Sequence, residues 1–275
     1  IVGGIEASLR RFSHYDYWSN KVRKSILLDC KADLLLYGMG EHSILEVADL
    51  LAKGVPVRDI RNVRGSCWYT SKESEIPLKD ENDNSPIFLP SFEGISAQTD
   101  ESKTEFAKSF VIQEQNTDAI NACILVEKSD SRFVVQNKPA LPLSTDEFDK
   151  VMELPYTRRW HPMYDKPASN GKTGVPALAE VQFSLTSVRG CFGACSFCAI
   201  TFHQGRRIQA RSHESLVKEA EKLTKLPDFK GYIHDVGGPT ANFRQPSCKN
   251  QLKHGVCKNK QCLGNIPCPN LEVDH

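Results

Sequence analysis

The sequence predicts an α/β fold with two strand-and-helix units, one near each end of the chain. The first begins with the apolar run "ADLLLYGMGE" (residues 32–41), which glycines end and a helical pattern follows. The second is a strand, helix and strand pattern between residues 181 and 240. Strands and helices that alternate in this way are typical of α/β proteins with parallel sheets.

Residues 1–70 predict the C-terminal part of a doubly wound α/β domain. The run at 32–41 has the character of a buried parallel strand. A helix follows it and ends at Lys53-Gly54, with a cation and a glycine typical of a helix end. Its predicted apolar face consists of Ile44, Leu45, Val47, Ala48 and Leu51. The stretch "DIRNVRGSCWYT" (59–70) predicts one more strand.

Residues 71–180 predict an irregular segment that connects and wraps its neighbours. It opens with the polar, turn-rich stretch "SKESEIPLKDENDNSP" (71–86), which favours a surface loop. Residues 101–115 are expected to be helical and residues 132–143 extended. The last part, from 152 to 180, has four prolines, so its His161 and aromatic side chains are interpreted as packing residues.

Residues 181–275 predict the start of an α/β barrel. "VQFSLTSVRG" (181–190) alternates apolar and polar residues and predicts a strand, and "GYIHDVGGPT" (231–240) predicts a second one that ends in a glycine pair. Between them, Ser212 caps a helix that runs to about Leu226, with i,i+4 charge pairs Glu214–Lys218 and Glu221–Lys225. Its apolar stripe is Leu216, Ala220 and Leu223. Barrels of this kind place their chemistry at the carboxyl ends of the strands.

Composition and charge narrow the class of protein. Of 275 residues, 40% are hydrophobic and 25% charged, as expected for a packed globular chain, and the formal net charge is +1. That charge gives no support to a protein that binds nucleic acid or membrane through bulk positive charge. The sequence shows neither a signal peptide nor an apolar run of the length that crosses a membrane. Seven of ten cysteines lie between residues 191 and 268, which favours metal ligation in a reducing compartment, the cytoplasm.

The stretch "CFGACSFC" (191–198) is the strongest candidate site. It holds Cys191, Cys195 and Cys198 in a C-x3-C-x2-C array after the first predicted barrel strand. A zinc site usually draws four ligands from two short pairs. Three thiolates on one tight loop suit a [4Fe–4S] cluster, with each thiolate on a different iron and the fourth iron open. Buried free thiols or half of a zinc site are the alternatives.

The cysteine array and several separated segments resemble the radical S-adenosylmethionine superfamily, and more narrowly its YgiQ type. The segments are "GGIEASLRRFSHYDYW", "YGMGE", "LPYTRRWHPMY", "SVRGCFGACSFCAITFHQGRRIQARS" and "HDVGGPTAN". They occur in the family's order and span nearly the whole chain. The resemblance implies the end of a Rossmann-like, cobalamin-domain-type unit followed by the first βαβ part of a partial TIM-type barrel. The D-x-H-x-x-G motif of cobalamin ligation is absent from the sequence, so cobalamin binding is not inferred.

The resemblance also implies a chemistry. Cys191, Cys195 and Cys198 would hold the [4Fe–4S] cluster, and S-adenosyl-L-methionine would chelate its open iron. One electron, from a reductant such as a flavodoxin or ferredoxin, would cleave the cofactor to a 5′-deoxyadenosyl radical that acts on an unknown substrate. Gly237 and Gly238 match the glycine-rich segment that contacts the cofactor, although Pro239 stands where an acidic residue is common.

Three arginines after the cysteine loop have two interpretations. Arg206, Arg207 and Arg211 could present a guanidinium fork to the carboxylate of the cofactor, or they could form a solvated basic loop.

A second cysteine group consists of Cys248, Cys257, Cys262 and Cys268. It stands among Lys, Asn, Gly and Pro and predicts a stapled loop, through zinc, an auxiliary cluster, disulfides or none of these.

The barrel starts near residue 181 and leaves room for only two strands. A full eight-stranded barrel takes about 250 residues. The sequence is therefore expected to be an internal fragment of a larger enzyme, inactive or slow by itself. The competing hypothesis is a non-catalytic module in which the clustered cysteines bind zinc or another metal.

Overall fold

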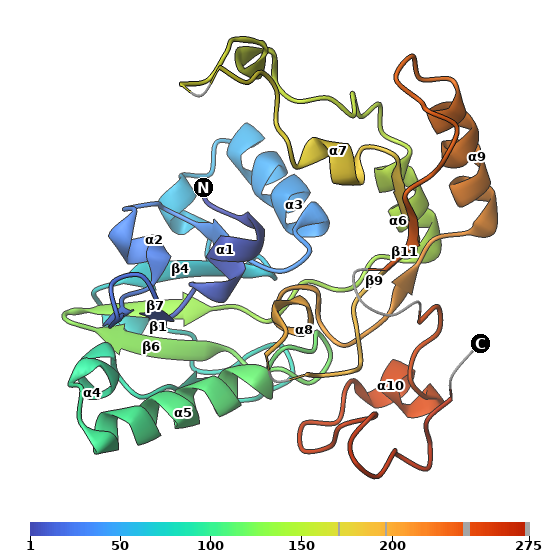
Figure 1. Ribbon diagram of the computed structural model, residues 1–275. Coiled ribbons are helices and arrows are strands. Elements are labelled where there is room, and N and C mark those ends of the chain that lie inside the picture. The colour runs from blue at the N-terminus through green and yellow to red at the C-terminus, as the bar shows by residue number, and fades with distance from the viewer. Residues whose placement is uncertain (170, 196, 239–242, 273–275) are drawn as a thin grey trace. The chain divides into compact units, whose positions relative to one another are not determined.

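Five strands form a mixed sheet in the first half of the chain (Figure 1). The computed structural model describes residues 1–169, 171–195, 197–238 and 243–272. The strand order is β3-β4-β7-β6-β5; β5 and β6 pair in parallel, and the other neighbouring strands of this order pair antiparallel. The bounds are β3 Leu35–Leu36, β4 Ser66–Thr70, β5 Ile87–Phe88, β6 Leu125–Ser129 and β7 Arg132–Gln136.

Two hydrophobic cores cover the two faces of this sheet. Successive residues of a strand face opposite sides, so Leu34 and Leu36 pack in one core with Val47, while Leu35 packs in the other with Ala7 and Leu27. Figure 1 shows α3 and α5 on opposite sides of the sheet. The covering helices are α1 Gly4–Leu9, α2 Ile26–Asp29, α3 Glu41–Ala52, α4 Phe92–Ser96 and α5 Asp100–Glu114, with short 3-10 turns η1 Val57–Asp59 and η2 Glu73–Glu75.

The chain divides into two compact units. The first comprises residues 1–142, 192–207 and 247–271, and the second comprises 143–191, 208–246 and 272–275. Besides the sheet, the first unit contains the hairpin β1 His14–Asp16 and β2 Lys21–Arg23, and the helices α8 Ala199–Gln204 and α10 Lys249–His254.

The second unit contains a parallel strand pair joined through a helix. β8 (Ser184–Thr186) pairs in parallel with β11 (Asp235–Gly237), and α9 (His213–Thr224) packs on them through Leu216 and Leu223. The Ser212 hydroxyl accepts a hydrogen bond from the Ser215 N–H and caps α9. The predicted order of strand, capped helix and strand is therefore confirmed, but both strands are shorter than the predicted runs, and Val181 is exposed and ends a short helix instead of starting the first strand. The other elements are α6 Thr145–Met152, η3 Pro162–Asp165, α7 Leu178–Val181 and the antiparallel pair β9 Val188–Arg189 and β10 Gln209–Ala210.

Two predictions for residues 1–70 are wrong in part. The helix lies where it was expected, but only Val47 of its predicted apolar face is buried, and Ile44, Leu45 and Leu51 are exposed. The buried strand pairs antiparallel with β4, while on its other edge Val2 forms an isolated parallel bridge with Leu35. An apolar run indicates a strand that is buried on both faces. Such burial does not determine whether the strand pairs parallel or antiparallel with its neighbours.

The segment 71–180 is more regular than its sequence suggested. The expected helix and extended run correspond to α5 and β7, and residues 87–136 supply three of the five strands of the sheet. The predicted limits at residues 70 and 180 stay predictions, and the two compact units divide the chain at other positions.

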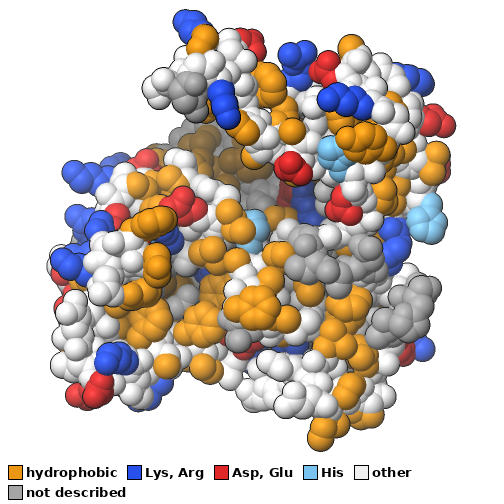
Figure 2. Space-filling model, in the orientation of Figure 1, with side chains coloured by type: hydrophobic (Ala, Val, Ile, Leu, Met, Phe, Trp, Pro, Cys, Tyr) orange, Lys and Arg blue, Asp and Glu red, His pale blue; other side chains and the backbone are white. Residues whose placement is uncertain are grey.

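The surface carries both signs of charge. Basic and acidic side chains are interspersed over the face in Figure 2, in keeping with the formal net charge of +1. In the part of the chain that the structure describes, no helix has the length and apolar character needed to cross a membrane.

Candidate cluster site

Cys191 follows strand β9 directly through a glycine turn. Gly190 has φ +84°, a conformation that side-chain-bearing residues rarely adopt, and it redirects the chain. The Cys191 side chain is buried and belongs to the second unit.

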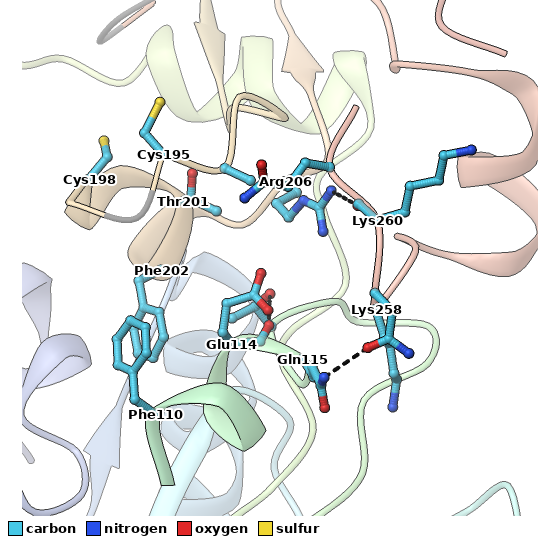
Figure 3. Close-up of a pocket in the computed structure, with 14 residues that line it drawn as sticks. Phe110, Glu114, Gln115, Cys195, Cys198, Thr201, Phe202, Arg206, Lys258 and Lys260 are labelled. Atoms are coloured by element: carbon cyan, nitrogen blue, oxygen red, sulfur yellow. Dashed lines mark hydrogen bonds between the residues drawn. The ribbon is translucent and has the colours of Figure 1, made fainter. Parts of the chain in front are cut away.

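Cys195 and Cys198 belong to the first unit and share one tight turn. The Cys198 N–H donates to the Cys195 carbonyl oxygen over 2.9 Å, and Cys198 is the N-cap residue of α8. Cys195 is exposed and Cys198 half-buried. In Figure 3 both sulfur atoms point to the same side, away from the ring pair of Phe110 and Phe202. This turn can therefore present two thiolates in one direction.

The two cysteines line a cavity of about 460 Å³ inside the first unit (Figure 3). Its walls come from α5, from α8 and from residues 258–261. The rings of Phe110 and Phe202 stack with centroids 5.6 Å apart and an interplanar angle of 7°. Arg206, Lys258 and Lys260 add positive charge and Glu114 a negative one. Cationic walls favour thiolates and other anions.

The three predicted ligands fall in different compact units, Cys191 in the second and Cys195 and Cys198 in the first. Within residues 1–169, 171–195, 197–238 and 243–272, no three His, Cys, Asp or Glu side chains could hold a common metal ion. All ten cysteines lie in this described part, and none of them is in a disulfide. The site of Cys191, Cys195 and Cys198 therefore stays a prediction.

Gly237 and Gly238 line a second cavity, which lies within the second unit and has a volume of about 600 Å³. Gly237 is the last residue of β11, where its partner in β8 is Thr186. The cavity runs along both parallel strands and reaches their carboxyl ends at Thr186 and Gly237, the end at which ligand sites lie in α/β folds. Pro239 lies outside the described residues.

Two of the three arginines considered for cofactor binding have internal partners. Arg206 is only 4% exposed and donates to the carbonyl oxygens of Cys257 (3.0 Å) and Lys260 (2.9 Å). Arg211 is also buried and donates to Glu219 and to the Ser215 hydroxyl. Both guanidinium groups hold the fold together, and the solvated basic loop is thus wrong for them. Arg207 is half-buried.

Sequence reasoning missed a buried glutamate of the second unit that pairs with two arginines. Glu219 of α9 accepts hydrogen bonds from both Arg158 and Arg211. Glu219 and Arg158 line the 600 Å³ cavity. The Arg211 guanidinium also lies 3.9 Å from Asp149. A glutamate at a position between Leu216 and Leu223 on the buried face of α9 was the available signal.

The second cysteine group lies in residues 247–271 of the first unit, a segment with hydrogen bonds between its own residues. The Cys268 N–H donates to the Cys262 carbonyl oxygen (3.1 Å), and the Cys262 thiol lies 3.4 Å from the Ser247 hydroxyl. A hydrogen bond from the backbone of Asn270 lowers the pKa of the Cys268 thiol. These contacts make a compact loop.

Comparison with known proteins places the chain in a family. The family described as "Radical SAM N-terminal" matches residues 1–184, more than half of the chain. This protein belongs to the radical SAM family. The resemblance inferred from the sequence is thereby confirmed, and on residues that precede the cysteine loop.

Relatives of this radical SAM protein extend the similarity across the loop. The UPF0313 proteins of Clostridium botulinum (strain Okra / Type B1) and Clostridium perfringens (strain SM101 / Type A) are 54% and 52% identical over 275 residues. The alignments cover 100% of this chain and 40% and 39% of these relatives. The chain therefore spans about two fifths of their length. No solved structure matches the chain.

Proposed function

We propose that this protein is an iron–sulfur enzyme that cleaves S-adenosyl-L-methionine reductively and acts on a substrate still to be identified. The observation that carries the proposal is the turn in which Cys195 and Cys198 present two thiols to the same side, four and seven residues after Cys191 (Figure 3). Membership in the radical SAM family supports it.

Cys191, Cys195 and Cys198 are the proposed ligands of a [4Fe–4S] cluster. Their chemistry fits, because iron–sulfur clusters take cysteine thiolates and none of the three is consumed in a disulfide. When bound, such a cluster supplies the electron that cleaves the cofactor. The residues of the chain orient this chemistry and limit the access of water.

Gly237 and Gly238 are the proposed contacts of S-adenosyl-L-methionine. Their backbone borders the cavity at the end of β11, so a ligand can approach the chain closely there. We propose that β8, α9 and β11 form the first βαβ part of a partial TIM-type barrel.

A one-electron donor and a reducing compartment complete the proposal. A flavodoxin or ferredoxin would supply the electron, and the cytoplasm would keep the thiols reduced. Since the chain covers about two fifths of its relatives, we expect residues 1–275 to hold the cluster weakly and to turn over slowly by themselves.

Detection of 5′-deoxyadenosine tests the proposed activity. The protein is purified and loaded with iron and sulfide under anaerobic conditions, then incubated with S-adenosyl-L-methionine and dithionite. A slow, cluster-dependent release of 5′-deoxyadenosine is expected, and it should vanish in a Cys195→Ala variant. Bound zinc without sulfide would instead favour a non-catalytic metal-binding module.

A further inference from the structure

We propose that Arg11 is a positioning residue for the cysteine turn. Its buried guanidinium holds the ring of Phe202, one helical turn after Cys198, and thereby fixes the place and electrostatic surroundings of that thiol. The part of this inference that concerns a cluster rests on the proposed function. The part that concerns the thiol itself does not.

Arg11 is a buried cation with defined partners. Its side chain is 2% exposed, although an arginine usually keeps its guanidinium in water. Nε donates to Gln136 Oε1 over 2.5 Å, and Nη1 donates to the Ser8 carbonyl oxygen. A charge at this depth is stable only when such contacts replace water. The guanidinium is therefore held in one position.

The Arg11 guanidinium packs against aromatic rings. Its central carbon lies 4.5 Å from the ring centroid of Phe202 and 5.0 Å from that of Tyr37. On α5, Phe110 stacks on Phe202, so that the Phe202 ring contacts both a cation and a second ring (Figure 3). Cation–π and ring contacts of this kind have strong geometric preferences.

The stack reaches the cysteine turn through α8. Cys198 is the N-cap residue of this helix, and Phe202 stands four residues later, about one helical turn along α8. Both residues line the 460 Å³ cavity and also a neighbouring apolar cavity of about 330 Å³. A second tie joins the same segments, because His203 Nδ1 lies 2.9 Å from the Ser8 hydroxyl.

Charge gives Arg11 a second effect on the site. A buried cation favours added negative charge nearby, and low-dielectric surroundings extend the range of this effect. Loss of the cation should therefore make a bound cluster harder to reduce. A residue that only fills space would not change that potential.

The cluster-free protein provides the first test. The alkylation rate of each cysteine is followed by mass spectrometry in the wild type, in Arg11→Met, and in Arg10→Met as the matched control. Arg10 is the adjacent arginine, and it forms an exposed ion pair with Glu6 (3.1 Å). Arg11→Met should alkylate several-fold faster at Cys198, with Cys30 unchanged, because α8 opens more often. Equal Cys198 rates in Arg11→Met and Arg10→Met would overturn the proposal.

The cluster-loaded protein provides the second test. Arg11→Met should lose iron to a chelator about 10–100-fold faster than the wild type, as when the support of a metal ligand is removed. The midpoint potential of the cluster in Arg11→Met should become more negative. Arg11→Lys keeps the charge but not the guanidinium contacts, so its potential should return toward the wild-type value while its cluster still loses iron to the chelator faster than the wild type. An unchanged potential in Arg11→Met would overturn the electrostatic part.

Two outcomes separate this inference from the proposed function. A wild-type protein that binds no iron and sulfide contradicts the proposed function, while the alkylation rates still decide on Arg11. If Arg11→Met does not fold, as judged by circular dichroism, Phe202→Leu takes its place in both tests. A folded Phe202→Leu with wild-type alkylation of Cys198 would overturn the inference.

Discussion

The Ser13 hydroxyl lies 2.7 Å from Oε1 of Glu127, and the Ser13 N–H lies 3.1 Å from both carboxyl oxygens. Glu127 is fully buried in strand β6, which lies between β7 and β5. Burial raises the pKa of its carboxyl group to about 7, although the hydrogen bonds from Ser13 oppose the shift. The folded protein therefore holds a proton on Glu127 at a pH where an unfolded chain has released it.

This relationship predicts a pH dependence of stability. Between about pH 4.3, the pKa of an unfolded glutamate, and about pH 7, the folded state binds the extra proton. The free energy of unfolding should therefore fall as the pH rises through this window, by at most about 1.4 kcal/mol per pH unit from Glu127, and level off above it.

Denaturant titrations from pH 5 to pH 8 check this with the variant Glu127→Gln. The amide oxygen can still accept from Ser13 but does not titrate, so the variant should gain stability relative to the wild type as the pH rises. Parallel pH curves for the two proteins would contradict the assignment.

Glu219 predicts a local loss of stability in the second unit. Its carboxylate balances the guanidinium groups of Arg158 and Arg211, and all three side chains are largely buried. Glu219→Gln leaves Arg158 without this counter-charge and leaves Arg211 with Asp149 alone, 3.9 Å away, so it should cost about 3 kcal/mol. Amide hydrogen exchange of α9 measures it. The control is Glu221→Gln at an exposed position of the same helix, where less than about 0.5 kcal/mol is expected. Similar exchange in both variants would refute the prediction.

Gly255 lies where the segment of the second cysteine group passes close to Asp118 of the same unit. A Cβ atom at this residue would lie 2.2 Å from Asp118 Oδ1, and its φ is +77°. Gly54 has a similar φ of +80° but no atom within 4 Å of such a Cβ, so it isolates the backbone cost. Gly54→Ala should cost about 1–2 kcal/mol.

Gly255→Ala should cost more, and its effect should be local to residues 247–271. Hydrogen exchange of that segment, together with the overall free energy of unfolding, gives the comparison. Equal losses of stability in the two variants would show that the Asp118 side chain moves aside, and that close contact between Gly255 and Asp118 is not required.

Local signals in the sequence predicted local structure well. A serine cap, an apolar stripe and Pro227 define α9, and each of these signals acts within a few residues. Lys218 departs from the pattern, since it pairs with Glu153 of α6 (2.8 Å) rather than with Glu214 one turn away. A partner from another element can replace a weak neighbour on the same helix.

The central hairpin of the sheet also had a sequence signal. The runs that become β6 and β7 are joined by Asp130-Ser131, and Asp130 has φ +51°. Two β-rich runs separated by two turn residues predict a hairpin. Strand direction at β3 had no comparable signal, because burial on both faces is the same in parallel and antiparallel sheets.

The cysteine turn was predictable, but its support was not. Cys195 and Cys198 stand out by spacing alone. The contact between Arg11 and Phe202 joins opposite ends of the first unit's sequence and arises only from tertiary packing. Nothing around "LRRF" distinguishes the buried Arg11 from the half-buried Arg10.

The iron and sulfide content after anaerobic reconstitution tests the central claim most directly. The protein is compared with the triple variant Cys191→Ala, Cys195→Ala, Cys198→Ala and with a control that changes the three scattered residues Cys30, Cys67 and Cys123 to alanine. About four irons and four sulfides per chain are expected in the wild type and the control, and almost none in the first variant. A cluster retained by the first variant, or zinc without sulfide in the wild type, would contradict the account.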